Sequence, residues 1–173
     1  MIFEKEDLDI CTKFSEEVDT SFYSKRNQFD NTKRKADTKI GKLGELAVYY
    51  HFKDKNISYP DFKIYSAKEK SWDYDLKTKN ENIHVKSQET LQGAKYGISW
   101  IFQLEDKHIK NYNDNDYVAF VSVNLLNKSA EIKSIMSVKS LHEKQLFKKP
   151  ILNKLNSKSA VYFEDLKDLP FEL

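Results

Sequence analysis

The first third of the sequence carries apolar residues at helical spacing. From Asp7 to about Gln28 they recur every three or four positions, which predicts an amphipathic helix. A second stretch, from about Thr38 to Lys53, has a broader apolar face and predicts a well-buried helix that ends near Asp54 to Asn56. Between them, NQFDNTKRKADTK holds polar and turn-forming residues and predicts a connection, part of which can continue as helix.

The remaining sequence consists mainly of short runs with the alternation or β-branched content of strands. After Tyr59-Pro60 these runs are DFKIYS, WDYDLKT, NIHVKSQ, ISWIFQL, DYVAFVSVNLL, AEIKSIMSV and SAVYF, whereas SLHEKQLF has a helical pattern. A polar cluster from Lys79 to Asn82 predicts a hairpin turn, and Gly93 and Gly97 mark a loop. Two helices followed by mostly sequential strands predict an α+β fold, or mixed α/β fold, with a central mixed β-sheet flanked by helices.

Length and composition favour one domain. Hydrophobic residues make up 39% of the 173 positions, enough for one ordinary core and too few for two comfortable domains. We therefore expect a single domain over 1–173, with a helical N-terminal part (1–56) and a sheet core (57–173). The chain lacks an apolar run of membrane-spanning length, and its first residues mix acids and bases, so no membrane span or signal peptide is expected.

The numbers of cysteines, histidines and glycines exclude several kinds of functional site. The single cysteine, Cys11, excludes an intramolecular disulfide and a cysteine-based zinc cluster, which suits a cytoplasmic protein. The four histidines are scattered without the spacing of a zinc site. Only four glycines occur, so a glycine-rich phosphate loop is excluded and no small-molecule organic cofactor is expected.

Positive charge is concentrated in one segment, although the net charge is only +2. Basic residues from Lys25 to Lys42 greatly outnumber the two aspartates there, Asp30 and Asp37. This bias predicts salt-dependent contacts with DNA phosphates, while a solvated helix surface is the commoner fate of such runs. The candidate DNA-binding residues are Lys25, Arg26, Lys33, Arg34, Lys35, Lys39 and Lys42.

The predicted hairpin brings three polar side chains together. If Asn80 and Glu81 form the loop, the register places Asp75 opposite Lys86, with His84 on the same face. Opposed side chains in an antiparallel pair have Cβ atoms about 5 Å apart, close enough to share a metal ion or a water. A loop one residue longer would put Asp75 on the other face.

An acidic, an imidazole and an ammonium group at this spacing could together catalyse phosphodiester hydrolysis. A divalent metal offsets phosphate charge and lowers the pKa of a bound water, and Lys86 would help to position or deprotonate that water. In the plain alternative, Ile83 and Val85 face the core and the polar residues are only the solvated side of the strand.

The ordered segments IGKLGELAVYYHF, DYDL and IHVKSQ resemble the PD-(D/E)xK nuclease superfamily, which includes many restriction endonucleases, Holliday-junction resolvases and repair nucleases. The resemblance spans residues 38 to 88, roughly a third of the chain. It implies a restriction-endonuclease-like core and a Mg²⁺- or Mn²⁺-dependent DNA endonuclease. Because one compact site cuts one strand, a homodimer is expected.

The resemblance also assigns roles to individual residues. It implies a helical metal ligand at Glu45 and a strand aspartate at Asp75, with Asp73 as the fallback. It further implies an acid-x-lysine element at His84-Val85-Lys86, in which the Val85 carbonyl joins the metal shell, followed by Gln88. The implied catalytic residues are thus Asp75, His84, Lys86, Glu45 and Gln88, and the implied metal ligands are Asp75, Glu45, His84 and Val85.

His84 departs from the superfamily pattern, which has Glu or Asp there. Imidazole suits Mn²⁺ or softer metals better than Mg²⁺. The enzyme would then use His84 as an atypical ligand or second base, prefer manganese, or have lost catalysis and kept the fold. We expect an active endodeoxyribonuclease, with a non-catalytic DNA-binding or regulatory module as one alternative. The other is an unrelated α+β interaction module whose lysines reflect an AT-rich coding genome.

Overall fold

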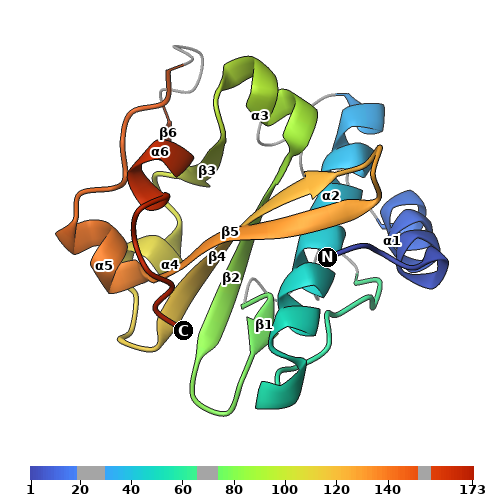
Figure 1. Ribbon diagram of the computed structural model, residues 1–173, viewed down its shortest axis with the longest axis horizontal. Helices are drawn as coiled ribbons and strands as arrows, with labels where there is room; N and C mark the ends of the chain where they lie inside the picture. Colours follow the sequence, from blue (N-terminus) through green and yellow to red (C-terminus); the bar gives the residue numbers. More distant parts are fainter. Residues whose placement is uncertain (19–29, 66–73, 152–156) are drawn as a thin grey trace.

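The computed structural model describes residues 1–18, 30–65, 74–151 and 157–173. Two long helices precede the strands, and short helices are interspersed among the strands (Figure 1). The helices are α1 (Lys5–Glu17), α2 (Asn31–His51), the 3₁₀ turn Lys53–Lys55, α3 (Thr90–Tyr96), α4 (Lys107–Lys110), α5 (Val138–Glu143) and α6 (Phe163–Leu166). The strands are β1 (Leu76–Lys77), β2 (Asn82–Glu89), β3 (Ser99–Gln103), β4 (Asp116–Asn124), β5 (Ser129–Ser137) and β6 (Lys158–Tyr162).

The described residues form a four-stranded sheet in the order β1-β2-β4-β5. Strands β2 and β4 are parallel, and the pairs β1–β2 and β4–β5 are antiparallel, so the sheet is mixed. Strands β3 and β6 form a separate antiparallel ribbon. Figure 1 shows α2 along the sheet with α1 beyond it, and α4, α5 and α6 on the other side. The predicted α+β fold with a central mixed sheet and flanking helices is confirmed.

The central strand β4 separates two apolar cores. Ala119 and Val121 pack with α1 and α2, whereas Val118 and Phe120 pack with β3, β6 and the C-terminal helices. All four side chains are fully buried. A strand covered on both faces reads as a continuous apolar run, as DYVAFVSV does. Its neighbour β2 therefore has one face toward α2 and the other toward β3.

The limits of the two long helices differ from the prediction. Helix α1 ends at Glu17, because Val18 has extended backbone angles (φ −64°, ψ 132°); residues 19–29 of the predicted helix lie outside the described residues. Helix α2 begins at Asn31 rather than near Thr38, because the Asp30 carboxylate caps it by accepting the N–H of Lys33 at 3.0 Å. The polar connection in the sequence is thus largely the exposed first half of α2.

Two predicted strands are absent or short. Residues 61–65 are irregular, because the Asp61 side chain accepts the Lys63 N–H at 2.8 Å and turns the backbone locally. The next strand is reduced to Leu76–Lys77, and its first predicted residues, 72 and 73, lie outside the described part.

Short helices replace some predicted loops. The segment with Gly93 is helix α3, whose first turn is capped by the Glu89 carboxylate, which accepts the N–H of Gln92 at 3.0 Å. It ends at Tyr96, and the capping residue after it is Gly97, which has a φ of 83°. The one-turn helices α4 and α6 are too short for a helical period to show in the sequence.

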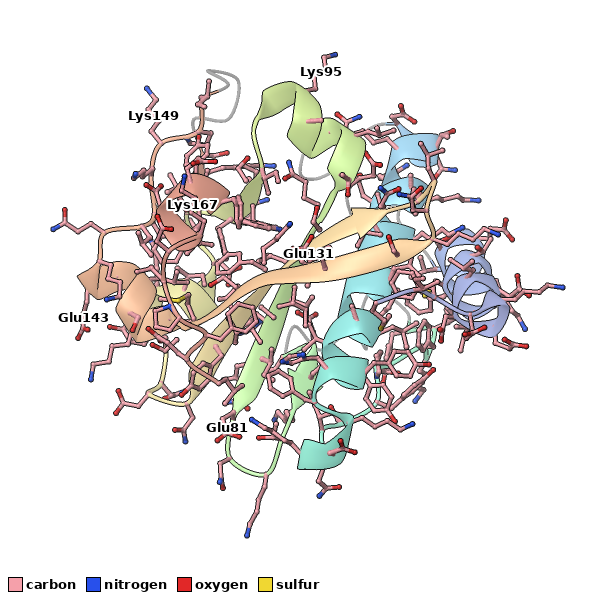
Figure 2. All side chains as sticks on the ribbon, in the orientation of Figure 1. Glu81, Lys95, Glu131, Glu143, Lys149 and Lys167 are labelled. Carbon is pink, nitrogen blue, oxygen red and sulfur yellow. The ribbon has the colours of Figure 1, made fainter. Side chains whose placement is uncertain are left out.

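Charged side chains cover the periphery of the molecule. In Figure 2 the labelled side chains Glu81, Lys95, Glu143 and Lys149 lie at the outline of the molecule, and Glu131 lies on β5 in the middle of the view. Among the helices of the described segments, each falls short of the length or apolar character that crossing a bilayer requires.

Candidate functional site

The register of the β1–β2 hairpin determines which side chains meet. The turn runs from Thr78 to Glu81, with the Thr78 N–H donating to the Glu81 carbonyl at 3.0 Å. Leu76 lies opposite Ile83, where regular pairing begins, so Asp75 comes just before the first paired residue and in register is nearest to His84. The predicted pairing of Asp75 with Lys86 is therefore wrong by two positions. The reason is the four-residue turn, in which the Thr78 hydroxyl bonds both the backbone and the side chain of Glu81.

Asp75 lies at the edge of β2, just before β1 begins. Its Oδ2 accepts the backbone N–H of Val85 at 2.8 Å, in the place where a longer β1 would supply a carbonyl. In a strand, the N–H and C=O of one residue point to the same edge. The Val85 carbonyl therefore faces the same edge of β2 as the Asp75 carboxylate.

Glu45, in the middle of α2, lies near Asp75. The Glu45 side chain is buried, and its pKa is raised to about 8, first by burial and then by the charge of Asp75. Two carboxylates interact strongly enough to shift a pKa only when they are close. The helical glutamate and the strand aspartate named by the resemblance therefore interact electrostatically.

His84 points away from α2. Its neighbours Ile83 and Val85 pack with α2 in the core, so His84 lies on the opposite face of β2. The His84 side chain is buried, and its ring is 4.9 Å from the ring of Tyr74. Here the imidazole is packed among other groups, on the face of β2 away from the helix that carries Glu45.

Lys86 shares this second face and extends toward β3. Its Nζ is 4.0 Å from a carboxylate oxygen of Asp106 and 4.9 Å from the ring centre of Phe102. Sequence reasoning missed Asp106. No local pattern marks it, because the packing of β3 against β2 is a tertiary contact.

The residues after Lys86 connect β2 to its neighbours. The Gln88 side-chain carbonyl accepts the N–H of Ser99 at 2.9 Å and so links β2 to β3. Ser87 faces α2 at Gly44, where an added Cβ would lie only 3.0 Å from the Ser87 Cβ. The strand and the helix are therefore in close contact directly beside the candidate site.

The structure describes the basic segment, Lys25 to Lys42, only from residue 30 onward. Lys25 and Arg26 lie outside the described residues, and Lys33 forms an exposed ion pair with Asp37 at 3.2 Å. Arg34 is half-buried on α2. Lys35, Lys39 and Lys42 follow one another at spacings of four and three residues, so they form one stripe on α2 that leads toward Glu45.

The donor atoms fit a hard divalent cation. Within residues 1–18, 30–65, 74–151 and 157–173, no three His, Cys, Asp or Glu side chains are grouped as a metal site. Mg²⁺ is commonly held by one or two carboxylates together with waters and substrate phosphates. Glu45, Asp75 and the Val85 carbonyl provide such a partial set. Asp73, the fallback ligand, lies outside the described residues.

Comparisons with protein-family models, curated proteins and solved structures returned no match to this chain. The functional interpretation therefore comes from the residues of the site and their geometry.

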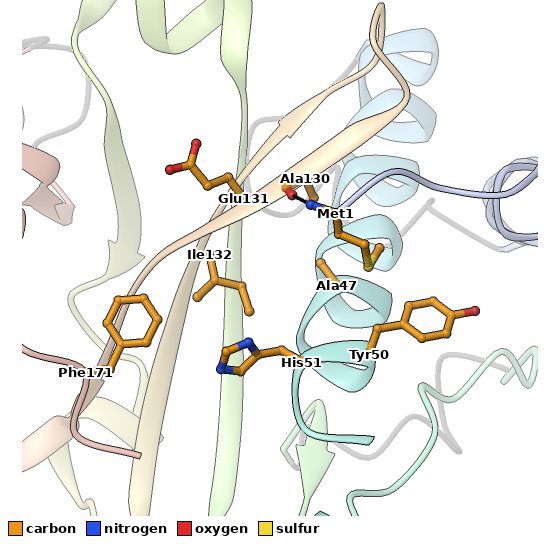
Figure 3. Close-up of a pocket in the computed structure, with 8 residues that line it drawn as sticks. All are labelled: Met1, Ala47, Tyr50, His51, Ala130, Glu131, Ile132 and Phe171. Atoms are coloured by element: carbon orange, nitrogen blue, oxygen red, sulfur yellow. Dashed lines mark hydrogen bonds between the residues drawn. The ribbon is translucent and has the colours of Figure 1, made fainter. Parts of the chain in front are cut away.

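A separate hollow of about 310 Å³ lies between α2, β5 and the C-terminal residues (Figure 3). One wall is stabilised by the Met1 amino group, which donates to the Ala130 carbonyl at 2.8 Å. Burial and the nearby Lys55 lower the pKa of His51, so its ring is neutral at pH 7. The lining is mostly apolar and suits packing better than phosphate chemistry. It consists of Met1, Ala47, Tyr50, His51, Ala130, Glu131, Ile132 and Phe171.

The Glu45→Gln variant is expected to change how stability depends on pH. The folded-state pKa of Glu45 is about 8, against an ordinary value of 4.5, so the folded chain holds a proton that the unfolded chain releases. The resulting stabilisation is full below pH 4.5 and is lost as the pH rises through 8. As the pH rises between these limits, the free energy of unfolding of wild type should fall by a few kcal/mol relative to that of Glu45→Gln.

Urea unfolding of both proteins at about pH 5 and about pH 8 measures this difference. Glu164→Gln is the control, because Glu164 is paired with a lysine but its side chain is 77% exposed. Identical pH dependence in wild type and Glu45→Gln would show that the Glu45 carboxyl group titrates normally.

Proposed function

We propose that this protein is a metal-dependent nuclease that hydrolyses phosphodiester bonds in DNA. The observation that carries the proposal is the Asp75 carboxylate held at the edge of β2 by the Val85 N–H, where it acts electrostatically on the buried Glu45 carboxyl group. A bound Mg²⁺ or Mn²⁺ would offset phosphate charge and lower the pKa of a water. The oxygen donors of these three residues suit either ion.

The chain's own residues supply orientation. Asp75 is fixed by its hydrogen bond to the Val85 N–H, so one carboxylate oxygen is held and the other is available for a ligand. Lys86 follows Val85 on β2 but extends from the face away from Glu45, so its ammonium would act on a phosphate oxygen or a water only on that side of the strand. Phe102 and Asp106 restrict the positions that this ammonium can adopt.

Helix α2 would guide DNA to the site. Lys35 and Lys39 lie on the stripe that leads to Glu45, and ten residues of helix span about 15 Å. Lysines spaced along this length are suited to contact successive phosphates without reading bases. A homodimer would present one such site to each strand of a duplex.

The direct test is cleavage of plasmid, phage and branched DNA by the purified protein, with Mg²⁺, with Mn²⁺ and with a chelator. Cleavage that requires metal supports the proposal, and stronger cleavage with Mn²⁺ would favour a role for His84. RNA substrates in parallel reactions would show whether the enzyme is restricted to DNA. Absence of DNA cleavage with either metal, with DNA binding retained, would contradict the nuclease proposal.

A second function, DNA binding without catalysis, is favoured by one observation. Both lysines near the site already have acidic partners, because Lys42 contacts Glu45 at 2.6 Å and Lys86 lies 4.0 Å from Asp106. In a non-catalytic protein these pairs would replace the metal. Calorimetry with Mn²⁺ separates the two functions, since a non-catalytic module would bind DNA and not the ion. Weak, non-specific DNA binding at moderate salt would instead favour an interaction module.

Replacing Lys35 and Lys39 together with Gln is expected to weaken DNA binding equally for all sequences. Each lost phosphate contact should reduce the slope of log affinity against log salt by about 0.9. Fluorescence anisotropy of labelled duplexes at several salt concentrations measures the slope. The control is the pair Lys139→Gln and Lys149→Gln, two exposed lysines at and beyond α5. Equal slopes in both double variants would show that α2 does not contact DNA.

A further inference from the structure

Lys42 is held at the acidic site by an unusually buried ion pair. Its Nζ donates to Oε2 of Glu45 at 2.6 Å, and the two side chains are 15% and 10% exposed. The pair Lys167–Glu164 has the same three-residue separation and the same 2.6 Å distance, but its side chains are 45% and 77% exposed. The Lys42 pair is thus shielded from solvent, where its charge acts more strongly than on the surface.

Two aromatic rings fix the Lys42 ammonium in place. Its Nζ is 5.1 Å from the ring centre of Phe14 on α1 and 5.5 Å from that of Phe62. The two rings contact each other edge to face, with centres 5.6 Å apart. Contacts of a cation with ring faces at these distances are attractive. Elements from three parts of the chain therefore hold one positive charge beside Glu45.

The surroundings of this charge are acidic. Asp75 and Asp61 both act electrostatically on Glu45, the carboxyl group that the Lys42 ammonium contacts. An ammonium bonded to a carboxyl group takes up an oxygen that a metal ion would otherwise use. It also repels any cation that binds to the same acids.

We infer that Lys42 is the protein's own cation at this site, occupying Glu45 through their hydrogen bond and limiting the site to one weakly held divalent ion bound mainly through Asp75. The identity of the ion as Mg²⁺ or Mn²⁺ rests on the proposed nuclease function. Lys42 is then a residue that sets metal affinity and number, and its position beneath Phe14 and Phe62 prevents it from acting as a mobile DNA contact.

The test is metal binding without DNA. Wild type, Lys42→Met and the control Lys167→Met are titrated with Mg²⁺ by calorimetry and with Mn²⁺ by electron paramagnetic resonance, near pH 8, after circular dichroism has shown that each is folded. Met preserves the aliphatic contact with the rings and removes the charge. Lys42→Gln is the alternative should Lys42→Met not fold. Asp75→Asn in the Lys42→Met background tests whether the ion binds at Asp75.

Lys42→Met should bind the ion at least about tenfold more tightly than wild type, or bind a second ion, because removing one nearby charge in a partly buried site changes affinity by more than that factor. Lys167→Met should match wild type, and adding Asp75→Asn should abolish the gain. Unchanged affinity in Lys42→Met, with wild type binding normally, overturns the inference and leaves the nuclease proposal standing. If neither wild type nor Lys42→Met binds the ions, both are overturned.

Discussion

Asp75→Asn is expected to reduce metal-dependent DNA cleavage by about 10³-fold or more, equivalent to about 4 kcal/mol of lost transition-state stabilisation. The Asp75 side chain is exposed, and its carboxylate accepts a hydrogen bond from the Val85 N–H. The side-chain carbonyl of Asn can accept the same hydrogen bond. The variant therefore keeps its shape and loses only the negative charge that binds the ion. Single-turnover cleavage of a labelled duplex in Mn²⁺ measures the effect, and Mn²⁺ calorimetry should show weakened binding.

Two further variants make this test specific. Asp114→Asn removes another surface carboxylate, paired with Lys139 at 3.6 Å, and should cleave like wild type. Lys86→Met should lower cleavage by about 10²-fold without weakening Mn²⁺ binding, because Lys86 is proposed to orient groups and not to hold the ion. Full cleavage by Asp75→Asn would place the active site elsewhere in the chain.

The sequence predicted the fold well wherever the signal was local. Alternation in NIHVKSQ and the apolar run in DYVAFVSVN correspond to β2 and β4, because burial of one or both faces leaves a direct pattern. The start of α2 was missed, since the capping Asp30 and the exposed helical residues after it resemble a loop in composition. The hairpin register was missed because bonds within the Thr78–Glu81 turn determine it.

The candidate site was only partly predictable. Glu45 and Asp75 are 30 positions apart and were paired by resemblance to a nuclease motif, not by any periodicity. The sequence did not predict the side chains that Lys42 and Lys86 contact. Lys86 meets Asp106 because β3 packs against β2, and Lys42 meets Phe14 and Phe62 because α1 and residues 57–65 pack on α2. Such contacts depend on how separate elements are arranged, which short-range patterns do not record.

Gly44→Ala is expected to destabilise the fold by about 2–4 kcal/mol, although Ala favours helix by about 1 kcal/mol over Gly. A Cβ at Gly44 would lie 3.0 Å from the Ser87 Cβ and still closer to the Ser87 hydroxyl, on a strand that pairs with β4 along its whole length. Helix α2 would have to move away from β2, and Glu45 would move with it. Urea unfolding measures the loss of stability.

Gly41→Ala is the matched control on the same helix. A Cβ at Gly41 meets nothing within 4 Å, so this substitution should stabilise the protein by about 0.5–1 kcal/mol. Ser87→Gly combined with Gly44→Ala should recover part of the loss, and the non-additivity of this double-mutant cycle measures the contact itself. Equal effects of the two helix substitutions would mean that α2 is not pressed against β2. In that case the distance between Glu45 and Asp75, and with it the proposed metal site, would lose its structural basis.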